Sequence, residues 1–322
     1  MNHRDRFLVV GLHPAIDRTL EISRFTAGGM IRGRVLMVEA AGKGANLVHS
    51  LSNFGHRLVA TGFVGRQDKA FFLSSFREDR VKAEFVPVES PTRENITIIE
   101  RDFRRDTHLV AGKLRVARAD VSRLRRIVAG EVAEGRWVVF SGSRPEGFRL
   151  SDYARLLSLC RKAGAKLCVD ASGPMLRAAL KARPWILKPN LDELSELVGR
   201  RLSRVNEIHE AAVRLTEWCE HVLVSLGRNG ALLVSRQGAW RARASRRISA
   251  VHTVGCGDAL LAGFLSACAC GKALPEATRF AVACGSACVS SYRACLLSED
   301  EAKRFLPGVR VVKLRCSRRS HP

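Results

Sequence analysis

A glycine-rich turn that leads into an apolar helix is the segment of this sequence best suited to phosphate chemistry. Residues 253–264 read TVGCGDALLAGF, with glycine at positions 255 and 257. Glycine lets the backbone approach a ligand closely, and the first turn of a helix offers unpaired N–H groups at the positive end of the helix dipole. The segment therefore predicts a site for a phosphate group.

Asp258 lies in the first turn of that expected helix. A carboxylate beside a bound phosphate can orient a hydroxyl group and accept its proton during in-line phosphoryl transfer. An acidic residue in a first turn also stabilises the helix dipole without any catalytic role. The local pattern leaves both interpretations of Asp258 open.

Lys43 and Asn46 belong to a second glycine turn, which reads AAGKGAN over residues 40–46. The turn does not match the Walker A pattern, because Gly44 follows the lysine, and it does not match G-x-G-x-x-G, because Leu47 occupies the last glycine position. It still places a cation and an amide at the start of a helix, where they suit a ligand. A plain strand-to-helix connection is the alternative.

Polar residues follow two further expected strands. Lys188 and Asn190 come directly after an apolar run, and open α/β sheets bind their ligands at the carboxyl ends of strands. Asn190 and Glu193 also match a helix capping box, which would be a purely structural role. Ser225 ends another strand, and the turn that follows it to Gly230 suits either the border of a nucleotide site or an ordinary hairpin.

These segments lie within an alternation of short strands and helices. Apolar runs predict strands over residues 7–12, 59–64, 137–141, 166–170, 185–188 and 221–226. Helical patterns cover residues 44–54, 151–163, 173–182, 191–197 and 206–219. Continuous apolar runs are typical of parallel strands that are buried on both faces. The alternation therefore predicts an open, doubly wound α/β sheet.

Two segments, residues 19–38 and 85–114, interrupt that alternation. They show little helical periodicity, and residues 92–100, TRENITIIE, alternate like a half-exposed strand. We expect both segments to form a small β lid inserted into a single domain over residues 1–322. The exposed edges of lid strands predict pairing between subunits, and hence a homodimer.

The composition favours a cytoplasmic globular protein. Hydrophobic residues make up 46% and charged residues 26% of the chain, and no run approaches the roughly 18–20 apolar residues that a membrane span needs. Several of the ten cysteines lie in alanine-rich helical segments, where a thiol packs as a small hydrophobe. The pair at 268 and 270 has no matching second pair, so we expect no zinc site.

The formal net charge of +23 has two interpretations. The chain could bind nucleic acid, or it could be an enzyme that handles anions and has a basic surface. The basic residues are scattered, and no helix-turn-helix or RNA-binding pattern accompanies them. Charge alone predicts non-specific association and not fold, so the second interpretation is favoured and no specific nucleic-acid partner is expected.

Taken together, these segments resemble the PfkB or ribokinase-like sugar kinases, and within that family the bacterial 1-phosphofructokinases and tagatose-6-phosphate kinases. The resemblance runs from about residue 10 to about residue 295. It is carried, in family order, by GLHPAIDRTLEI, AAGKGANLVHSLSNFG, TRENITI, VVFSGSRPEGF, DASGPMLRAAL, WILKPNLDEL, LVSLGRNGALLV and TVGCGDALLAGFL. The family fold is a mostly parallel sheet with helices on both faces and a β lid.

The resemblance implies a role for each matched position. Asp258 would be the catalytic base, beside an anion hole of Gly255, Cys256 and Gly257. The sugar pocket would contain Asp17, Gly42, Lys43, Asn46, Arg93, Asn95 and Ser141, with Asp17 on the sugar hydroxyls and Arg93 and Asn95 on its phosphate. The nucleotide would contact Lys188, Asn190, Ser225, Gly227 and Gly230, while Asn190 and Glu193 organise Mg²⁺ through water.

The implied reaction is ATP-dependent phosphoryl transfer to a phosphorylated ketohexose, with Mg²⁺ as the metal cofactor. Fructose 1-phosphate, phosphorylated at its 6-hydroxyl to fructose 1,6-bisphosphate, is the leading candidate. Arg93 offers a guanidinium fork suited to a sugar phosphate. Tagatose 6-phosphate and fructose 6-phosphate are the alternative substrates. A catalytically silent sugar- or nucleic-acid-binding relative is the alternative from another class.

The sequence departs from the family pattern at four places. Cys256 replaces the usual alanine of the anion hole, where a small thiol still fits. Arg144 and Glu146 bring charges into the usual SGSLPPG. Arg66 replaces the second glycine of a pair, and residues 107–110 lack a frequent lid asparagine. Since the lid helps to select the sugar, this last change bears on substrate choice.

Overall fold

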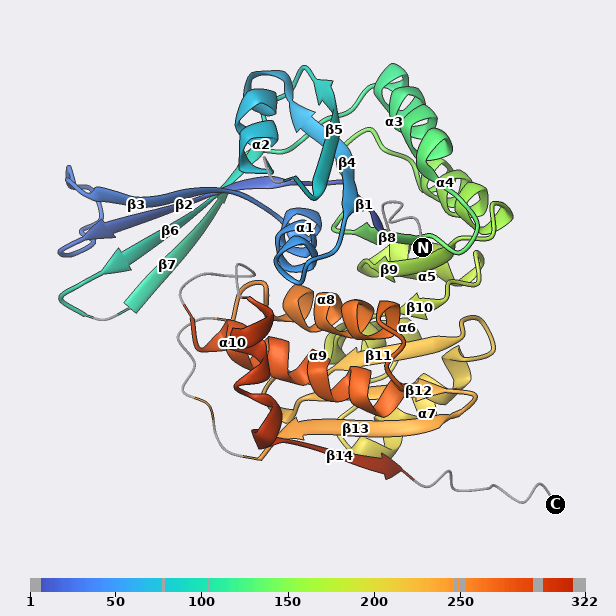
Figure 1. The fold of residues 1–322 in the computed structure, drawn as a ribbon. Coiled ribbons are helices and arrows are strands. Elements are labelled where there is room, and N and C mark those ends of the chain that lie inside the picture. Colours follow the sequence, from blue (N-terminus) through green and yellow to red (C-terminus); the bar gives the residue numbers. More distant parts are fainter. Residues whose placement is uncertain are drawn as a thin grey trace.

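The computed structural model describes residues 7–76, 79–103, 105–245, 248, 253–291 and 298–314. In this part of the chain, ten strands form the central sheet, in the order β14-β13-β12-β11-β10-β9-β8-β1-β4-β5 (Figure 1). They are β1 (Phe7–Gly11), β4 (Leu58–Gly65), β5 (Val81–Val88), β8 (Trp137–Ser141), β9 (Lys166–Asp170), β10 (Ile186–Leu187), β11 (His221–Ser225), β12 (Ala231–Ser235), β13 (Gly238–Ala244) and β14 (Val309–Leu314).

The sheet is mostly parallel, as the sequence predicts. All neighbouring strands from β5 to β11 pair in parallel, whereas β12, β13 and β14 form an antiparallel extension at one edge. Strand β1 explains the burial on both faces, because Phe7 and Val9 enter one hydrophobic core while Leu8 and Val10 enter the other. The predicted doubly wound α/β fold is confirmed.

Helices cover both faces of the sheet (Figure 1). One face carries α1 (Lys43–Asn53), α2 (Lys69–Ser75), α8 (Cys256–Ala269), α9 (Leu274–Val289) and α10 (Glu299–Lys303). The other carries α3 (Arg118–Glu131), α4 (Leu150–Lys162), α5 (Gly173–Leu180), α6 (Leu191–Val198) and α7 (Val205–Leu215). Short 3₁₀ turns are η1 (Arg66–Asp68), η2 (Gly227–Asn229) and η3 (Leu306–Gly308). No helix among the described residues is long and apolar enough to cross a bilayer.

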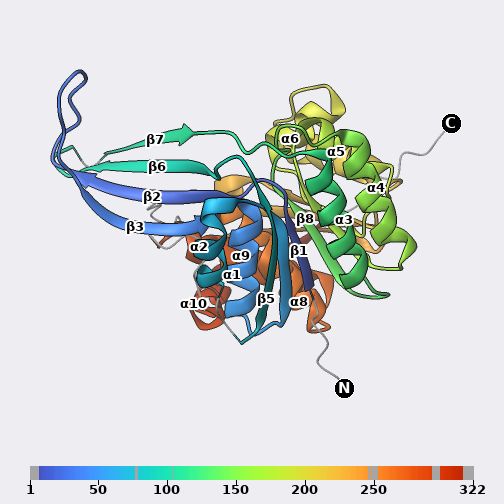
Figure 2. The same cartoon turned by 90° about the horizontal axis from the view of Figure 1, so that it is seen from above.

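A second sheet of four strands projects from the main one (Figures 1 and 2). Its order is β3-β2-β6-β7, with β2 (Ala15–Ile22), β3 (Arg34–Ala41), β6 (Arg93–Glu100) and β7 (Arg105–Ala111). The β2–β3 hairpin is inserted between β1 and α1, and the β6–β7 hairpin between β5 and α3. The two hairpins meet through the parallel pairing of β2 with β6. We refer to this second sheet as the lid.

The expected lid segment 85–114 begins too early. Residues 85–88 belong to β5, which pairs in parallel with β4 in the main sheet, and the lid strand β6 begins only at Arg93. The physical reason is the position of β5 at the edge of the sheet, where it alternates between exposed and buried residues as a lid strand does. The other lid hairpin extends past its expected limits, 19 and 38, at both ends.

A close backbone contact positions α1 at the carboxyl end of β1. A Cβ atom placed on Gly44 would come within 2.6 Å of the Gly11 Cα, and one on Gly62 would come within 1.9 Å of the Gly11 carbonyl oxygen. Only glycine fits at such approaches. The helix therefore begins directly against the central strands, and its first turn lies at their carboxyl ends.

Candidate active site

Polar residues from separate strands are aligned at the carboxyl edge of the sheet. In the strand register, Gly11 of β1 pairs with Ser141 of β8, which in turn pairs with Asp170 of β9. Asp170 is fully buried, and Ser141 is nearly so. This is the edge at which open α/β sheets bind ligands. The residues of α1, α6 and α8 discussed below gather around it.

Asp258 is buried in the first turn of α8, where Asn46 of α1 holds its carboxylate. The Asn46 Nδ2 atom donates to Asp258 Oδ2 at 2.7 Å. Burial raises the pKa of Asp258 to about 7, and the negative charge of Asp170 acts in the same direction, against the Asn46 hydrogen bond and the charges of Lys43 and Lys188. A carboxyl group with this pKa exchanges protons readily at neutral pH, as a general base must.

Lys43, Asp170 and Lys188 form an ionic cluster beside Asp258, in which Asp170 and Lys188 are buried and Lys43 is partly exposed. The Asp170 Oδ1 atom lies 2.9 Å from Lys43 Nζ and 3.3 Å from Lys188 Nζ. Burial alone would raise the pKa of Asp170, but the two ammonium groups outweigh it and hold that pKa below its ordinary value. The same attraction raises the pKa of Lys43 despite its burial. Lys43 therefore stays charged, and Asp170 lies between two lysine side chains.

The glycine turn before α8 lies against this cluster. Gly255 caps the helix in a left-handed conformation with φ 76°, which favours glycine. A Cβ atom on Gly257 would lie 3.6 Å from Lys188 Nζ, so the ammonium group lies beside the first turn of α8. The helix dipole and the lysine charge act together at this point. The geometry suits a phosphate group.

Cys256 is the residue that departs from the family pattern in this turn. Its thiol hydrogen-bonds with Cys288 of α9, and this contact together with burial raises the pKa of Cys256. The thiol is therefore neutral, and it points toward α9. Arg144 and Glu146, the charged departures, have contacts of their own with the Phe148 carbonyl and with Arg115.

The capping box at the start of α6 is present. Asn190 Oδ1 accepts from the Glu193 amide at 2.7 Å, and the Glu193 carboxylate accepts from the Asn190 amide at 2.8 Å. Asn190 also pairs with Ser225 through an isolated parallel bridge, and Glu193 lies 4.0 Å from Lys43. The structural interpretation is thus confirmed, and it places both residues next to the ionic cluster.

Gly227 and Gly230 flank the turn between β11 and β12, which is an antiparallel hairpin. Gly230 has φ 82°, and a Cβ atom there would come within 2.0 Å of the Ala242 carbonyl oxygen, so packing against β13 accounts for this glycine. Gly227 has φ 55°, and nothing lies within 4 Å of a Cβ built on it. The hairpin interpretation is confirmed, and only Gly227 presents an open surface.

The predicted sugar residues of the lid also come together. Asp17 of β2 is opposite Asn95 of β6, and Asn95 Nδ2 donates to Asp17 Oδ1 at 2.7 Å. Arg93 Nε donates to the Pro14 carbonyl at 3.3 Å. Within the described residues the Arg93 guanidinium forms no ion pair, and burial lowers its pKa. A partly buried cation without a carboxylate partner suits an anionic ligand.

Gly42 and Ser141 connect the lid residues to the ionic cluster. Gly42 caps α1 with φ 92°, and a Cβ atom there would lie 3.2–3.3 Å from atoms of His13, Pro14 and Ala15. The Ser141 Oγ atom is buried without a hydrogen-bond partner among the described residues. A buried hydroxyl of this kind is available to a ligand.

Sequence reasoning missed three residues at this site. Asp170 anchors both lysines, and His13 hydrogen-bonds through Nδ1 to Ser143 Oγ at 2.8 Å. Burial and the nearby Arg93 lower the pKa of His13 to about 4, so this ring is neutral at pH 7. A signal for Asp170 was present, since it is a carboxylate at the carboxyl end of a buried apolar strand. His13 and Ser143 carried no comparable signal.

Comparison with known families agrees with this arrangement. The family model described as "pfkB family carbohydrate kinase" matches residues 6–301. The chain belongs to the pfkB family of carbohydrate kinases. As a member of this family of kinases, it uses ATP as the phosphate donor. Its fold is that of the ribokinase-like kinases, and its sequence is similar to those of 1-phosphofructokinases.

Two curated pfkB relatives illustrate the likeness. The chain is 34% identical to the 1-phosphofructokinase of Rhodobacter capsulatus over 265 residues, which cover 81% of this chain and 83% of that one. It is 31% identical to the 1-phosphofructokinase of Xanthomonas campestris, over 94% of this chain and 95% of that one.

Solved pfkB structures share the fold. The phosphofructokinase-2 of Escherichia coli in complex with fructose-6-phosphate has a TM-score of 0.86 at 26% identity, and covers 94% of this chain and 99% of its own. A possible 1-phosphofructokinase of Thermotoga maritima has a TM-score of 0.84 at 27% identity, covering 96% and 99%. The Arabidopsis thaliana ribokinase complexed with ribose and ATP, at 22% identity and a TM-score of 0.71, shows the fold alone.

Proposed function

We propose that this protein transfers the γ-phosphate of ATP to the 6-hydroxyl of fructose 1-phosphate and releases fructose 1,6-bisphosphate. The observation that carries the proposal is the buried carboxylate of Asp258, which Asn46 orients in the first turn of α8 beside the Lys188 ammonium. The choice of sugar is supported by the likeness to 1-phosphofructokinases over most of the chain.

Asp258 would act as the general base of this reaction. Its pKa of about 7 leaves a substantial ionised fraction at neutral pH, and that carboxylate accepts the proton of the sugar hydroxyl as the hydroxyl oxygen attacks. Asn46 fixes one oxygen, so the other faces the substrate. The N–H groups of the turn formed by Gly255, Cys256 and Gly257 would stabilise the charge on the phosphoryl group in flight.

Lys43 and Lys188 would supply the positive charge that holds the donor and acceptor together. Lys188 lies beside the turn before α8, where the transferred phosphoryl group is expected, and Lys43 lies on the α1 side with Gly42. Because Asp170 binds both ammonium groups, neither lysine has to be ordered when the substrates arrive. Such preorganisation lowers the cost of reaching the transition state.

The residues at this site also fit a Mg²⁺ ion held through water. The Asp170 Oδ2 atom is buried without a hydrogen-bond partner in the described part of the chain, and the Glu193 carboxylate lies 4.0 Å from Lys43 Nζ. Mg²⁺ is usually bound by one or two carboxylates together with waters and substrate phosphates. Asp170, Glu193 and the Asn190 amide would hold the ion. When bound, Mg²⁺ neutralises charge on the ATP phosphates.

The sugar would lie between the lid and the carboxyl edge of the sheet. Asp17 and Asn95 offer a hydrogen-bonded pair of polar groups to its hydroxyls, and Ser141 offers a buried hydroxyl. Arg93 is the guanidinium available for the sugar phosphate. The adenine nucleotide would lie on the opposite side of Asp258, against Ser225 and Gly227 of the β11–β12 hairpin, while Gly230 would shape the turn through its packing against β13.

An ADP-release assay over a panel of hexoses tests this proposal. Wild-type protein should turn over fructose 1-phosphate faster than tagatose 6-phosphate, fructose 6-phosphate or free fructose. Asp258→Asn should lower kcat by about 10²–10⁴-fold, the usual contribution of a general base. Asp120→Asn is the matched control, because Asp120 is also a buried carboxylate at the third position of a helix, α3, away from the site.

The outcomes separate the parts of the proposal. Near-normal turnover by Asp258→Asn would contradict its role as base. Faster turnover of another sugar phosphate would contradict the choice of acceptor and leave the base intact. Absence of turnover with every sugar, together with tight DNA binding at physiological salt, would identify a catalytically silent relative.

Two further features of this kinase are proposed. Exposed apolar residues lie on the outer strands of the lid, including Val35 and Leu36 of β3 and Val110 of β7. Burial of these residues against a second copy would form a homodimer through the lid. We also place the reaction in the cytoplasm, where ATP is available. We propose no specific nucleic-acid partner for the basic surface.

A further inference from the structure

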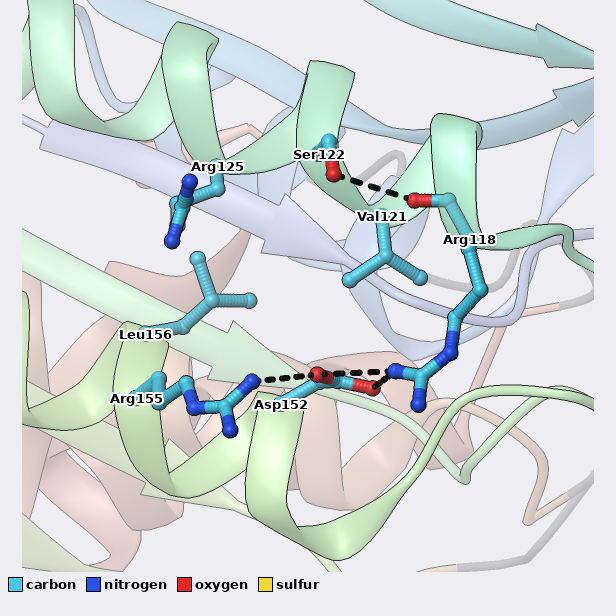
Figure 3. A pocket seen from close by; sticks show the side chains of 7 residues that line it. All are labelled: Arg118, Val121, Ser122, Arg125, Asp152, Arg155 and Leu156. Carbon is cyan, nitrogen blue, oxygen red and sulfur yellow. Dashed lines mark hydrogen bonds and ion pairs between the residues drawn. The ribbon is translucent and has the colours of Figure 1, made fainter.

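A cavity of about 360 Å³ lies between α3 and α4, apart from the candidate active site (Figure 3). It is lined by Arg118, Val121, Ser122, Arg125, Asp152, Arg155 and Leu156, none of which belongs to the site described above. We refer to it as the α3–α4 pocket. The lining contains three arginines and one aspartate, so it carries two net positive charges.

Asp152 holds two of these arginines in place. Its carboxylate lies 3.1 Å from Arg118 Nη1 and 3.3 Å from Arg155 Nη1, and its side chain is 5% exposed. Each ion pair engages one nitrogen of a guanidinium that carries five N–H donors. Because the guanidinium side chains are 55% and 66% exposed, N–H groups that Asp152 does not engage remain accessible to a ligand. The carboxylate thus orients two forks for another anion.

Arg125 provides a third charge that Asp152 does not neutralise. It projects from α3 into the space between the helices (Figure 3), and within the described residues it forms no ion pair. Arg118 is the first residue of α3 and Asp152 the third residue of α4, so both helices also direct their positive ends toward this region. These contributions all favour a ligand of negative charge.

The volume and the apolar residues restrict the class of ligand. A cavity of about 360 Å³ is within the range of small-molecule sites and far larger than one phosphate ion needs. Val121 and Leu156 contribute an apolar part of the wall. We propose that the α3–α4 pocket binds a small phosphorylated metabolite with two or more negative charges, separately from the catalytic site.

Isothermal titration with inorganic pyrophosphate, in magnesium-free buffer at fixed ionic strength, tests this proposal. The informative pair is Arg125→Glu and Arg126→Glu. Both residues are exposed neighbours on α3 and both changes alter the net charge equally, but only Arg125 lines the pocket. The catalytic site is unchanged in all three proteins, so it contributes the same background to each titration.

Arg125→Glu should lose one pyrophosphate site or weaken it by about tenfold or more, while Arg126→Glu should behave as wild type. Arg155→Gln, which removes one of the oriented forks, should weaken the same site. Both pocket variants should retain wild-type kcat and sugar KM, which makes the result independent of the proposed function. Thermal unfolding in buffer alone checks that each variant folds.

Two results would overturn the proposal. One is an unchanged pyrophosphate stoichiometry and affinity in Arg125→Glu. The other is equal weakening by Arg125→Glu and Arg126→Glu, accompanied by displacement of pyrophosphate by a 20-base-pair DNA duplex. The second result would identify a diffuse basic surface for polyanions and not a pocket for a metabolite.

Discussion

At the residue scale, the proposed chemistry depends on how three charges are balanced around one carboxylate. Asp258 is buried and close to Asp170, and both effects favour its neutral form. Asn46, Lys43 and Lys188 favour its ionised form. A pKa of about 7 is the outcome of this competition. The effect of each neighbour on the pKa of Asp258 should therefore be measurable as a shift of the pH–rate profile.

The first such prediction concerns the acid side of the profile. Since a raised carboxyl pKa means that the base is ionised only above it, kcat/KM should rise with pH up to about 7 and then level off. Steady-state rates between pH 5.5 and 8.5 measure this. A flat profile across that range would show that a different group limits proton transfer.

Lys43 should influence the pH at which the acid limb of that profile rises. Its positive charge lowers the pKa of Asp258, so Lys43→Met should move the acid limb to higher pH, in addition to weakening substrate binding. Lys272→Met, at an exposed lysine in the turn between α8 and α9, is the control and should leave the limb in place. A limb that shifts equally in both variants would contradict the local electrostatic account.

At the element scale, helix starts bring the functional residues to one edge of the sheet. Lys43 is the first residue of α1, Asn190 caps the start of α6, and Asp258 lies in the first turn of α8. Each start has its own local cause: a left-handed glycine at Gly42 and Gly255, and a capping box at Asn190. The same residues therefore stabilise the helices and form the proposed binding surfaces.

The capping box of α6 allows these two roles to be separated. Asn190→Ala should destabilise the fold by about 1 kcal/mol and also raise the KM for ATP. Ser298→Ala removes the equivalent cap of α10, where Ser298 accepts from the Glu301 amide away from the site. Urea unfolding should show a similar decrease in the free energy of unfolding for both variants, whereas only Asn190→Ala should change the KM for ATP. Equal KM values would leave Asn190 with a structural role alone.

Local patterns predicted the elements that are buried on both faces and the turns between them. The apolar run of β1 and the Asn190–Glu193 capping box could be read directly from neighbouring residues. Strand β5 could not be assigned to the main sheet in this way, because an edge strand alternates between exposed and buried residues as a lid strand does. The strand end at Asp170 was recognisable, but its pairing with two lysines was not, because they are 127 and 18 residues away and only the tertiary fold brings them together.

At the scale of the whole molecule, the lid is the part that extends beyond the compact sheet and its helices (Figure 2). Its two outer strands expose apolar residues, and Val110 of β7 is 68% exposed. Exposed apolar residues on strand edges are associated with pairing between chains. Since the lid also carries Asp17, Arg93 and Asn95, assembly of the dimer would bear on the sugar site.

Light scattering after size exclusion tests the proposed lid dimer. Wild type should have twice the chain mass of 35.5 kDa, and Val110→Asp should dissociate toward that mass. Val312→Asp is the control, because Val312 is 60% exposed on β14, an edge strand of the main sheet, and it should leave the dimer intact. A wild-type protein of 35.5 kDa, or equal dissociation of both variants, would exclude assembly through the lid.

The parallel pairing of β2 with β6 has a consequence for how this fold can change in evolution. The lid consists of two separate insertions, and each alone would be a two-stranded hairpin, which is marginally stable in water. The Asp17–Asn95 pair also requires both insertions, one residue from each. Loss of either hairpin would remove half of that pair and expose a new edge on the other. We therefore expect proteins that share this fold to have both insertions or neither.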